Sequence, residues 1–366
     1  MALDHVRALA ALTVFTWHFI HSGNGFPVPF AGAPAIFPLS ILDEGHTGVA
    51  LFMTLSGYLF AKILHGKLVS YPLFLWNRLL RLAPLLILVI AAVGTEQYLR
   101  NGNFQLWAYT RQLLKGAVLP SLPNGGWSIT VEAHFYLILP VLMIASRRWP
   151  QAPLAFLAVA VMARLVLYLH CGEVQYLSYW TIVGHIDQFL LGIFAFRYRS
   201  LLCGRHALAA ATGLCFAAFY YGFDAAGGFY KMGGYPSATP LWIIIPTFEG
   251  AAYSILIAYY DSSFAPSNNG ISGLIGRAGA YSYSIYLLHF FVVFRAAKFI
   301  DMHVMDISNF YVACLWSAFC FCLMVPVGWV SFRYIEEPFL SLRKRYIKAP
   351  EVPSSAQTLP LGQRER

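Results

Sequence analysis

Long apolar runs, separated by shorter polar or Gly/Pro-rich segments, recur along almost the whole chain. A helix needs about 20 apolar residues to cross a bilayer, whereas a transmembrane β-strand needs only about ten residues of alternating polarity. The runs in this chain are long and continuous, which favours helices and excludes a barrel. Ten of them predict membrane helices near residues 5–22, 46–64, 79–99, 129–146, 152–170, 179–197, 207–223, 240–260, 280–299 and 309–333. The pattern predicts an all-α, polytopic membrane protein.

Composition agrees with this pattern. Of 366 residues, 58% are hydrophobic and only 11% are charged, whereas soluble domains carry about 25% charged residues. The net charge of +9 is better explained by basic loops beside a membrane than by nucleic-acid binding. The six cysteines show neither a paired framework nor the spacing of a zinc site, so we expect no metal.

The basic residues also predict an orientation. With the N-terminus inside, seventeen of the 25 Lys and Arg residues fall in inner loops and the tail, six fall outside, and Arg7 and Arg164 fall within helices. This bias places both termini in the cytoplasm. The first apolar segment lacks a basic leader and a small-residue cleavage site, so we expect it to be retained. We assign residues 1–340 to one transmembrane domain and 341–366 to a polar, Pro/Ser/Gln-rich cytoplasmic tail without fixed structure.

Two ionisable residues share one face of the first predicted helix, in the stretch RALAALTVFTWHF. Arg7 and His18 are eleven positions apart, which returns to within roughly 20° of the starting direction about 16 Å along the axis. Taken singly, Arg7 could reach lipid phosphates and His18 could be a packed core histidine. Together they suggest a cytosolic anionic ligand held at Arg7 and a proton-accepting imidazole deeper in the membrane.

A second basic pair, in RLLRLAPLLILVI, opens the third predicted helix. Arg78 and Arg81 are three residues apart and therefore lie on one side of the helix. The simple interpretation is the basic collar of a membrane helix. The functional interpretation is a phosphate clamp, for which the planar guanidinium is well suited.

The segment NGGWSITVEAHFYLILP places an acid inside an apolar run. Trp127 is expected at the membrane interface, Ser128 as a helix N-cap, and Glu132 about one turn further on. An unpaired carboxylate is costly in an apolar setting. Glu132 is therefore either an interfacial, hydrated residue or a buried carboxylate that orients an imidazole or contacts substrate; the second interpretation is preferred.

Small and aromatic residues suggest further pocket positions, and Trp127 and Ser128 are among them. Ser56 and Gly57, in GVALFMTLSGYL, suit either close helix packing or a ligand-lining role. Tyr286 and His289, in YSIYLLHFF, share a helix face and suit either packing or the pocket.

Three more polar residues lie in apolar runs without an assignable role. Arg164, His185 and Asp187 fall in the fifth and sixth predicted helices. A charge at mid-bilayer costs at least about 2.5–3.5 kcal/mol on insertion scales, so each needs a partner. The sequence does not name these partners.

Six motifs occur in an order that resembles the membrane acyltransferase 3 family: LDHVRALAALTVFTWH, GVALFMTLSGYL, RLLRLAP, WSITVEAHFYL, YSIYLLHF and RYIEEPF. The resemblance covers roughly residues 3–340. It implies a ten-helix domain of an integral membrane O-acyltransferase, which uses acyl-CoA, commonly acetyl-CoA, as its cytoplasmic donor.

The resemblance also implies roles for individual residues. The family's arginine–ten–histidine motif matches Arg7 and His18, with Arg7 as a donor-binding cation and His18 as the catalytic base. Its paired arginines match Arg78 and Arg81 as donor-binding residues, and its glutamate after Trp-Ser matches Glu132 as a second catalytic residue.

Three positions depart from the family pattern. His5 and Ala8 replace glycines, and Ala50 replaces a frequent acidic residue. These departures bear on the identity of the acceptor more than on the acyl-transfer reaction.

The expected function is O-acetyl transfer from acetyl-CoA to a sugar hydroxyl of a cell-surface or secreted glycan or glycolipid, of the lipopolysaccharide, exopolysaccharide or lipo-chitooligosaccharide type. The expected location is the bacterial cytoplasmic membrane, with lipid as the surrounding partner. Two alternatives remain open: an O-acyltransferase of a small molecule, and a proton-coupled secondary transporter, for which intramembrane Arg, His, Asp and Glu residues would also be suitable. A structural membrane protein would not need the aligned Arg7 and His18.

Overall fold

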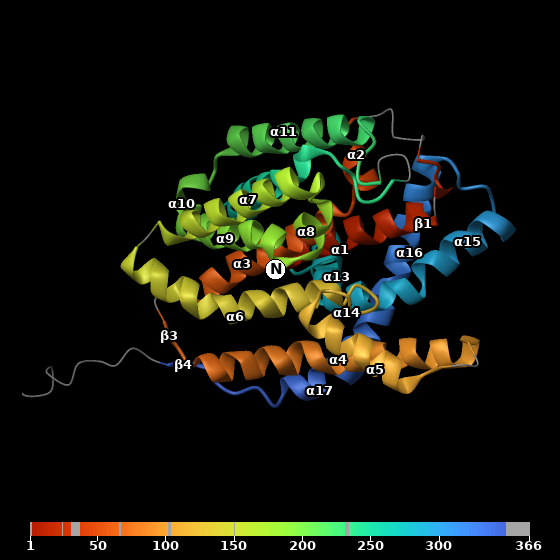
Figure 1. Cartoon of the computed structure of the whole chain (residues 1–366), viewed down its shortest axis with the longest axis horizontal. Coiled ribbons are helices and arrows are strands. Elements are labelled where there is room, and N and C mark those ends of the chain that lie inside the picture. Colours follow the sequence, from red (N-terminus) through yellow and green to blue (C-terminus); the bar gives the residue numbers. More distant parts are fainter. Residues whose placement is uncertain are drawn as a thin grey trace, which may run out of the picture.

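The structure is a computed structural model, and it describes residues 2–23, 25–30, 37–65, 67–101, 104–149, 151–230 and 234–348. Helices make up most of these ranges, and the strands are short (Figure 1). The α-helices are α1 (Ala2–Ile20), α2 (Ser40–Asp43), α3 (Thr47–Leu64), α4 (Tyr71–Asn101), α5 (Leu106–Val118), α6 (Trp127–Arg148), α7 (Ala152–Cys171), α8 (Gln175–Trp180), α9 (Ile182–Arg197), α10 (Arg199–Leu202), α11 (His206–Ala225), α12 (Ile245–Ser263), α13 (Gly270–Ala280), α14 (Ser282–Leu288), α15 (Val293–His303), α16 (Phe310–Ser331) and α17 (Glu337–Leu340). The remaining elements are the 3₁₀ turns η1 (Pro240–Ile243) and η2 (His289–Phe291), the π turn η3 (Phe332–Glu336), and the strands β1 (His21–Gly23), β2 (Phe26–Pro27), β3 (Leu68–Val69) and β4 (Ile347–Lys348).

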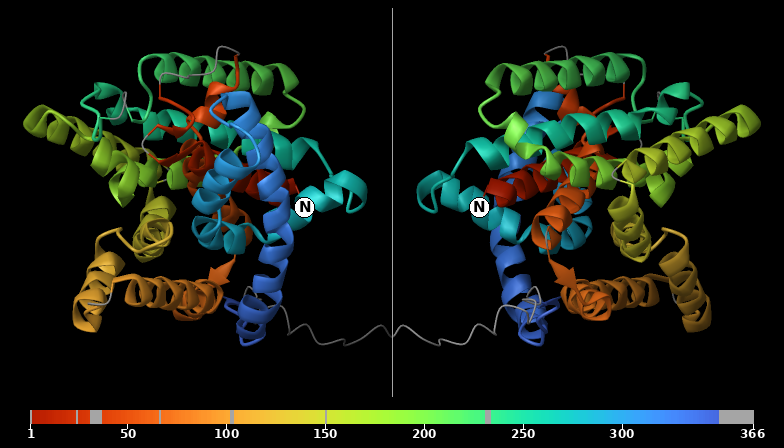
Figure 2. Two further views of the ribbon diagram at one scale, coloured as in Figure 1. Left: turned by 90° about the vertical axis from the view of Figure 1, so that its right-hand side faces the viewer. Right: turned by 90° about the vertical axis from the view of Figure 1, so that its left-hand side faces the viewer.

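Helix α1 is central to the fold. It packs against α3, α13 and α16, and it contacts α12, α14 and α15 as well. The two end-on views in Figure 2 show other helices on several sides of it. A helix surrounded by protein does not need to be apolar throughout, which explains why α1 carries Arg7 and His18.

Glycines bring α3 and α9 unusually close together. A Cβ atom at Gly57 would collide with the Phe189 carbonyl oxygen, and one at Gly192 would collide with the Thr54 carbonyl oxygen. Small residues at such crossings allow two helix backbones to approach each other. Of the two roles considered for Gly57, the structure therefore assigns helix packing.

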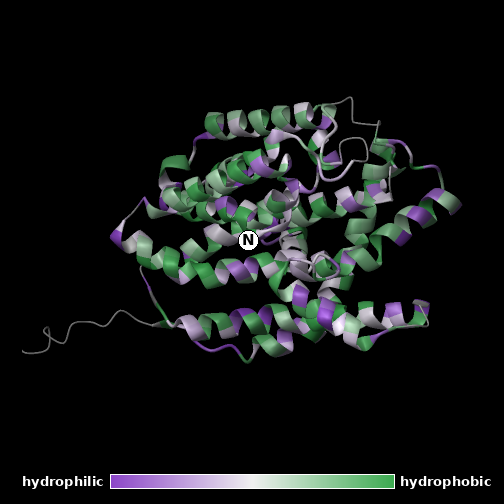
Figure 3. Cartoon of the chain, in the orientation of Figure 1, coloured by the Kyte–Doolittle hydropathy of each residue, from purple (hydrophilic) through white to green (hydrophobic). Residues whose placement is uncertain are grey.

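Six of the described helical stretches are long and apolar enough to cross a membrane: Thr47–Leu64, Tyr71–Arg100, Trp127–Ser146, Ala152–Cys171, His206–Ala225 and Phe310–Leu340. This result confirms an all-α, multi-pass membrane protein. Hydrophobic residues predominate along these helices in Figure 3. Three further expected spans are helical, as α1, α9 and α12, but α9 has only 16 residues.

The expected helix over residues 280–299 is not continuous. It is divided into α14, the 3₁₀ turn His289–Phe291 and α15. The His289 side chain donates through Nδ1 to the carbonyl oxygen of Tyr286 at 2.5 Å, a short-range bond that competes with helical pairing. His289 therefore lies at a break between helices and not in the middle of one.

The segment after α17 returns to the helical body. Strand β4 pairs antiparallel with β3, so that Lys348 is opposite Leu68 and Ile347 is opposite Val69. Residues 341–348, which the sequence assigns to the tail, instead contact the start of α4. The remaining part of the expected tail, 349–366, lies outside the described residues.

Candidate active site

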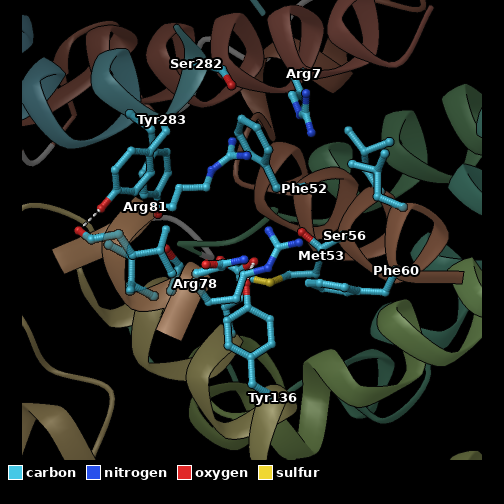
Figure 4. A pocket seen from close by; sticks show the side chains of 18 of the residues that line it. Arg7, Phe52, Met53, Ser56, Phe60, Arg78, Arg81, Tyr136, Ser282 and Tyr283 are labelled. Carbon is cyan, nitrogen blue, oxygen red and sulfur yellow. Dashed lines mark hydrogen bonds between the residues drawn. The ribbon is translucent and has the colours of Figure 1, made fainter. Parts of the chain in front are cut away.

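A cavity of about 280 Å³ lies among α1, α3, α4, α6 and α14. Its volume is at the small end of the range for ligand pockets, roughly 300–1,000 Å³. Of the site residues predicted from sequence, those that line it are Arg7, Ser56, Arg78, Arg81, Ser128, Glu132 and Tyr286. In Figure 4 the side chains of Arg7, from α1, and of Arg78 and Arg81, from α4, extend toward one central space.

The cavity is strongly basic. Arg7, Arg78, Arg81 and Arg343 line it, and Glu132 is the one carboxylate among its described lining residues. No ion pair joins Arg78 or Arg81 to an acid within the described part of the chain. Guanidinium groups without an ion-pair partner are well suited to bind a phosphate.

The supporting contacts orient these arginines. Arg7 Nη1 donates to Asp4 Oδ1 at 2.5 Å, one turn earlier on α1. The Arg78 guanidinium carbon lies 4.8 Å from the centroid of the Phe60 ring and 5.3 Å from that of Phe74. Aromatic faces attract guanidinium groups while leaving their N–H edges available.

Arg343 reaches the cavity because hydrogen bonds between residues far apart in the chain hold its segment there. Asn77 Nδ2 donates to the carbonyl oxygen of Lys344 at 2.7 Å, and the Lys344 N–H donates to Asn77 Oδ1 at 3.0 Å. The Ser70 N–H also donates to the Tyr346 carbonyl oxygen at 2.8 Å. Partial burial and the nearby Arg81 and Arg78 lower the pKa of Arg343, consistent with a cluster of like charges. Sequence reasoning missed Arg343, because it follows the last apolar run and resembles any basic tail residue.

His18 lies beyond the cavity and not in its lining. Its ring centroid is 5.2 Å from that of His289, 4.6 Å from that of Phe290 and 4.6 Å from that of Trp17. Although surrounded by these rings, His18 remains partly exposed. Arg7 and His18 thus lie in different surroundings on α1, and only Arg7 lines the cavity.

A row of rings connects the cavity to His18. Tyr286 lines the cavity, and its ring centroid is 5.8 Å from that of His289. Because His289 Nδ1 carries the proton donated to Tyr286, Nε2 holds a free lone pair. This Nε2 is buried and has no hydrogen-bond partner within the described residues. A buried imidazole with a fixed tautomer and an unpaired basic nitrogen therefore lies beside His18.

Glu132 faces the arginines and not His18. Its Oε1 accepts a hydrogen bond from the Tyr136 hydroxyl, and both residues line the cavity. The rings found next to His18 belong to Trp17, His289, Phe290 and Phe294. Of the two roles that the sequence suggested for Glu132, the geometry does not show the pairing with the His18 imidazole; it places Glu132 at the basic end of the site, where the other role, contact with substrate, stays open.

The model of an acyltransferase domain matches residues 2–333, nearly the whole chain. The chain belongs to the acyltransferase 3 family. It is 30% identical over 194 residues to nodulation protein 10 of Rhizobium leguminosarum bv. viciae, which covers 46% of this chain and 50% of that protein. It is 24% identical over 377 aligned positions to the peptidoglycan O-acetyltransferase OatA of Listeria monocytogenes serovar 1/2a, covering 92% of this chain and 55% of that protein. The chain thus spans about half the length of these curated relatives, and no solved structure matches it.

Two predicted pocket residues of this acyltransferase domain differ in their surroundings. Trp127 contacts the rings of Tyr179 and Trp180, outside the cavity lining. Ser128 lines the cavity, but it is not the N-cap: α6 begins at Trp127 after Gly126. The Ser128 hydroxyl donates instead to the Gly125 carbonyl oxygen at 2.9 Å.

The unassigned intramembrane charges of the domain pair with each other. Arg164 Nη2 is 2.6 Å from Asp187 Oδ2, and both side chains are fully buried. His185 bonds through its two ring nitrogens to Gln188 Oε1 and to the Tyr179 carbonyl oxygen, each at 2.6 Å. Buried charges with partners of this kind need no ligand to explain them.

A carboxylate cluster that sequence reasoning missed lies near the other end of α1. Carboxylate oxygens of Asp43, Glu44 and Asp224 all lie within 4.8 Å of one another, and the three residues are buried. Burial and the Asp224 carboxylate raise the pKa of Asp43, and the same two causes raise that of Glu44 to about 8. His21 Nε2 lies 3.5 Å from Asp43 Oδ1. Only folding brings Asp224 to this pair, so spacing gave no signal.

The acyltransferase domain should lose thermal stability as the pH rises from about 4 to about 9. In the unfolded chain Asp43 and Glu44 ionise near pH 4. In the folded protein their raised pKa values keep them protonated until higher pH. Stability from this cluster is therefore fully present below about pH 4 and is lost progressively until the pH passes the folded pKa values of about 8 and about 9. Unfolding temperatures measured in detergent should show this fall, and Asp43→Asn should reduce its slope. The exposed Asp306→Asn should not, and equal slopes in all three proteins would contradict the assignment.

Proposed function

We propose that this protein transfers an acetyl group from acetyl-CoA to a sugar hydroxyl of a cell-surface or secreted glycan or glycolipid. The observation that carries the proposal is the arginine-lined cavity, from which ring contacts lead through Tyr286 and His289 to His18. One end of this arrangement suits a polyanion and the other suits proton transfer. Family membership supports acyl transfer as the chemistry.

The donor binds with its phosphates at Arg78, Arg81 and Arg343, and with Arg7 assisting. All four guanidinium groups line one cavity, where bidentate contacts to phosphate are available. The eleven residues from Arg7 to His18 correspond to about 16 Å of helix, which an extended thioester arm spans. Tyr286 and Phe52 both line the cavity, with ring centroids 5.9 Å apart, and Tyr286 also contacts His289, so we expect these rings to move when donor binds.

His18 is the proposed base. The acceptor oxygen attacks the thioester carbonyl, His18 accepts the hydroxyl proton, and CoA leaves as the thiolate. In the alternative order His18 is acylated first and the hydroxyl then attacks the acyl-imidazole. His289, whose Nε2 is unpaired, is positioned to hold His18 or to relay its proton. Glu132 is proposed to act at the donor end, since it lies among the arginines.

The acceptor class follows from the relatives and from the membrane setting. The name of OatA describes an O-acetyltransferase of peptidoglycan, which is a glycan. The other relative is a nodulation protein. We propose ten membrane segments with both termini in the cytoplasm, as the loop charges indicate. The bacterial cytoplasmic membrane is the proposed location, because acyl-CoA is then available on one side and glycan precursors on the other.

Purified protein given acetyl-CoA labelled in the acetyl group tests the proposal. We expect release of CoA thiol and label in a glycan fraction from the host cell. Mass spectrometry of surface glycans with and without the gene should show acetyl-sized differences. If the label appeared only in a small molecule, the acceptor would be a small molecule and not a glycan. Flux into proteoliposomes without label transfer would favour a transporter, although the fully buried Arg164–Asp187 pair already accounts for two of the charges that suggested one.

Removing the hydrogen bonds that hold the segment of Arg343 at the cavity should weaken acetyl-CoA binding without stopping acetyl transfer. Asn77→Ala removes both hydrogen bonds to the Lys344 backbone, each worth about 0.5–1.5 kcal/mol. We expect the KM for acetyl-CoA to rise roughly three- to tenfold, with kcat little changed. Arg343→Gln should cause a similar rise, and the double variant should add little, because the two residues act together. Thr95→Ala, an exposed position further along α4, is the control. Additive effects of Asn77→Ala and Arg343→Gln would contradict the coupling.

A further inference from the structure

A second groove, of about 600 Å³, lies beside the active site at the basic ends of α3, α6, α7 and α9. These helix ends lie together on the left side of Figure 1. The groove shares only Phe60 with the arginine-lined cavity, so α3 separates the two. Most of its wall is apolar, formed by Leu64, Leu139, Met143, Pro153, Ile193 and Phe194.

The rim of this groove is cationic. His65, Lys67 and Arg197 are exposed and line it, whereas no Asp or Glu is among its described lining residues. Neither Lys67 nor Arg197 has an ion pair within the described part of the chain. A ligand that complements the groove is therefore anionic at one end and apolar along its length.

The groove adjoins the surface that faces lipid. Helices α6 and α7 are both long and apolar enough to span the membrane. Close to the groove residues, Ile144 on α6 is 60% exposed and Leu154 on α7 is 45% exposed, as expected for side chains in contact with acyl chains. Lys67 and Arg197 lie at the end of the helices where loop charges place the cytoplasm.

We propose that this groove binds an anionic phospholipid of the cytoplasmic leaflet. The phosphate of the headgroup lies between Lys67 and Arg197, and one acyl chain lies along the apolar wall. Basic pockets between membrane helices on this side are known to take anionic headgroups. The mostly apolar walls of the groove suit a lipid chain better than they suit a nucleotide. The four arginines that would bind the phosphates of the donor already line the neighbouring cavity. The lipid would hold α3, α6, α7 and α9 together beside the site.

Native mass spectrometry of the full-length protein in detergent, titrated with phosphatidylglycerol or phosphatidylcholine, tests this proposal. We expect wild type to retain phosphatidylglycerol preferentially and to gain thermal stability from it. Lys67→Gln/Arg197→Gln should weaken phosphatidylglycerol binding roughly tenfold or more, since each basic residue near the headgroups contributes substantially. Ile193→Trp, which fills the groove and keeps both charges, should also reduce it.

The matched control is Arg205→Gln/Arg277→Gln, which removes two exposed cations from the same expected side, away from the groove. The control should bind phosphatidylglycerol as wild type does. Equal losses in both double variants would show a non-specific charge effect and overturn the proposal, as would equal retention of the two lipids. If Lys67→Gln/Arg197→Gln instead raised the KM for acetyl-CoA in lipid-free detergent and left phosphatidylglycerol binding intact, the groove would belong to the donor and not to a lipid.

Discussion

His18→Ala should abolish acetyl transfer while leaving the protein folded. A positioned general base contributes about 10²–10⁴ to the rate, and acyl-imidazole formation would require His18 absolutely. The ring is partly exposed and makes no hydrogen bond in the described structure, so its removal leaves no buried polar group unpaired. We expect kcat for labelled acetyl transfer to fall at least about 100-fold, with unchanged expression and unfolding temperature.

Variants of His134 and His289 show whether a loss of acetyl transfer is specific to His18. His134→Ala, on α6 and outside the cavity lining, should retain normal transfer. His289→Ala should lower kcat less than His18→Ala does, because His289 acts through its neighbour. If His18→Ala kept ordinary transfer and His289→Ala abolished it, His289 would be the base, and the assignment of His18 to that role would be wrong.

Arg81→Ala should raise the KM for acetyl-CoA by about 10- to 100-fold with a smaller effect on kcat. Hydrogen bonds to a charged group contribute about 1.5–3 kcal/mol, and each 1.36 kcal/mol is a factor of about ten. Arg81 lines the cavity without an ion-pair partner among the described residues, so its charge is available to the donor. Steady-state kinetics with varied acetyl-CoA at saturating acceptor measure this change.

Two further variants, a conservative one at Arg81 and one at an arginine away from the cavity, test the proposed role of Arg81. Arg81→Lys should recover only part of the loss, because an ammonium supplies charge without the planar pair of donors. Arg277→Ala removes an exposed arginine on α13 and should leave the KM unchanged. An unchanged KM in Arg81→Ala, or full recovery in Arg81→Lys, would count against a bidentate phosphate clamp.

Much of the helical framework could be predicted from hydrophobicity, because lipid requires long apolar helices wherever the chain crosses. Nine of the ten expected segments correspond to helices, α1, α3, α4, α6, α7, α9, α11, α12 and α16. The tenth is broken at His289, where a 3₁₀ turn begins and the side chain donates to the Tyr286 carbonyl oxygen. Hydropathy does not detect such a bond.

The candidate site was predictable only in part. The spacing of Arg78 and Arg81 on one helix indicated a shared direction, and both line the cavity. Arg343 was missed, because two hydrogen bonds between Asn77 and Lys344, 267 positions apart, bring it there. Glu132 was expected either to orient an imidazole or to contact substrate; it accepts a hydrogen bond from Tyr136 and lines the arginine-rich cavity, a position that suits the second role.

By itself, the sequence determined that this chain is a helical membrane protein and that Arg7 and His18 share a face of α1. These properties depend on local hydrophobicity and on the helical repeat, which short stretches of chain already specify. The tertiary structure alone decided that four arginines from three separate segments meet in one cavity, that His289 adjoins His18, and that Asp224 joins Asp43 and Glu44. Contacts between residues far apart in the chain depend on how the helices pack, and no local pattern encodes that packing.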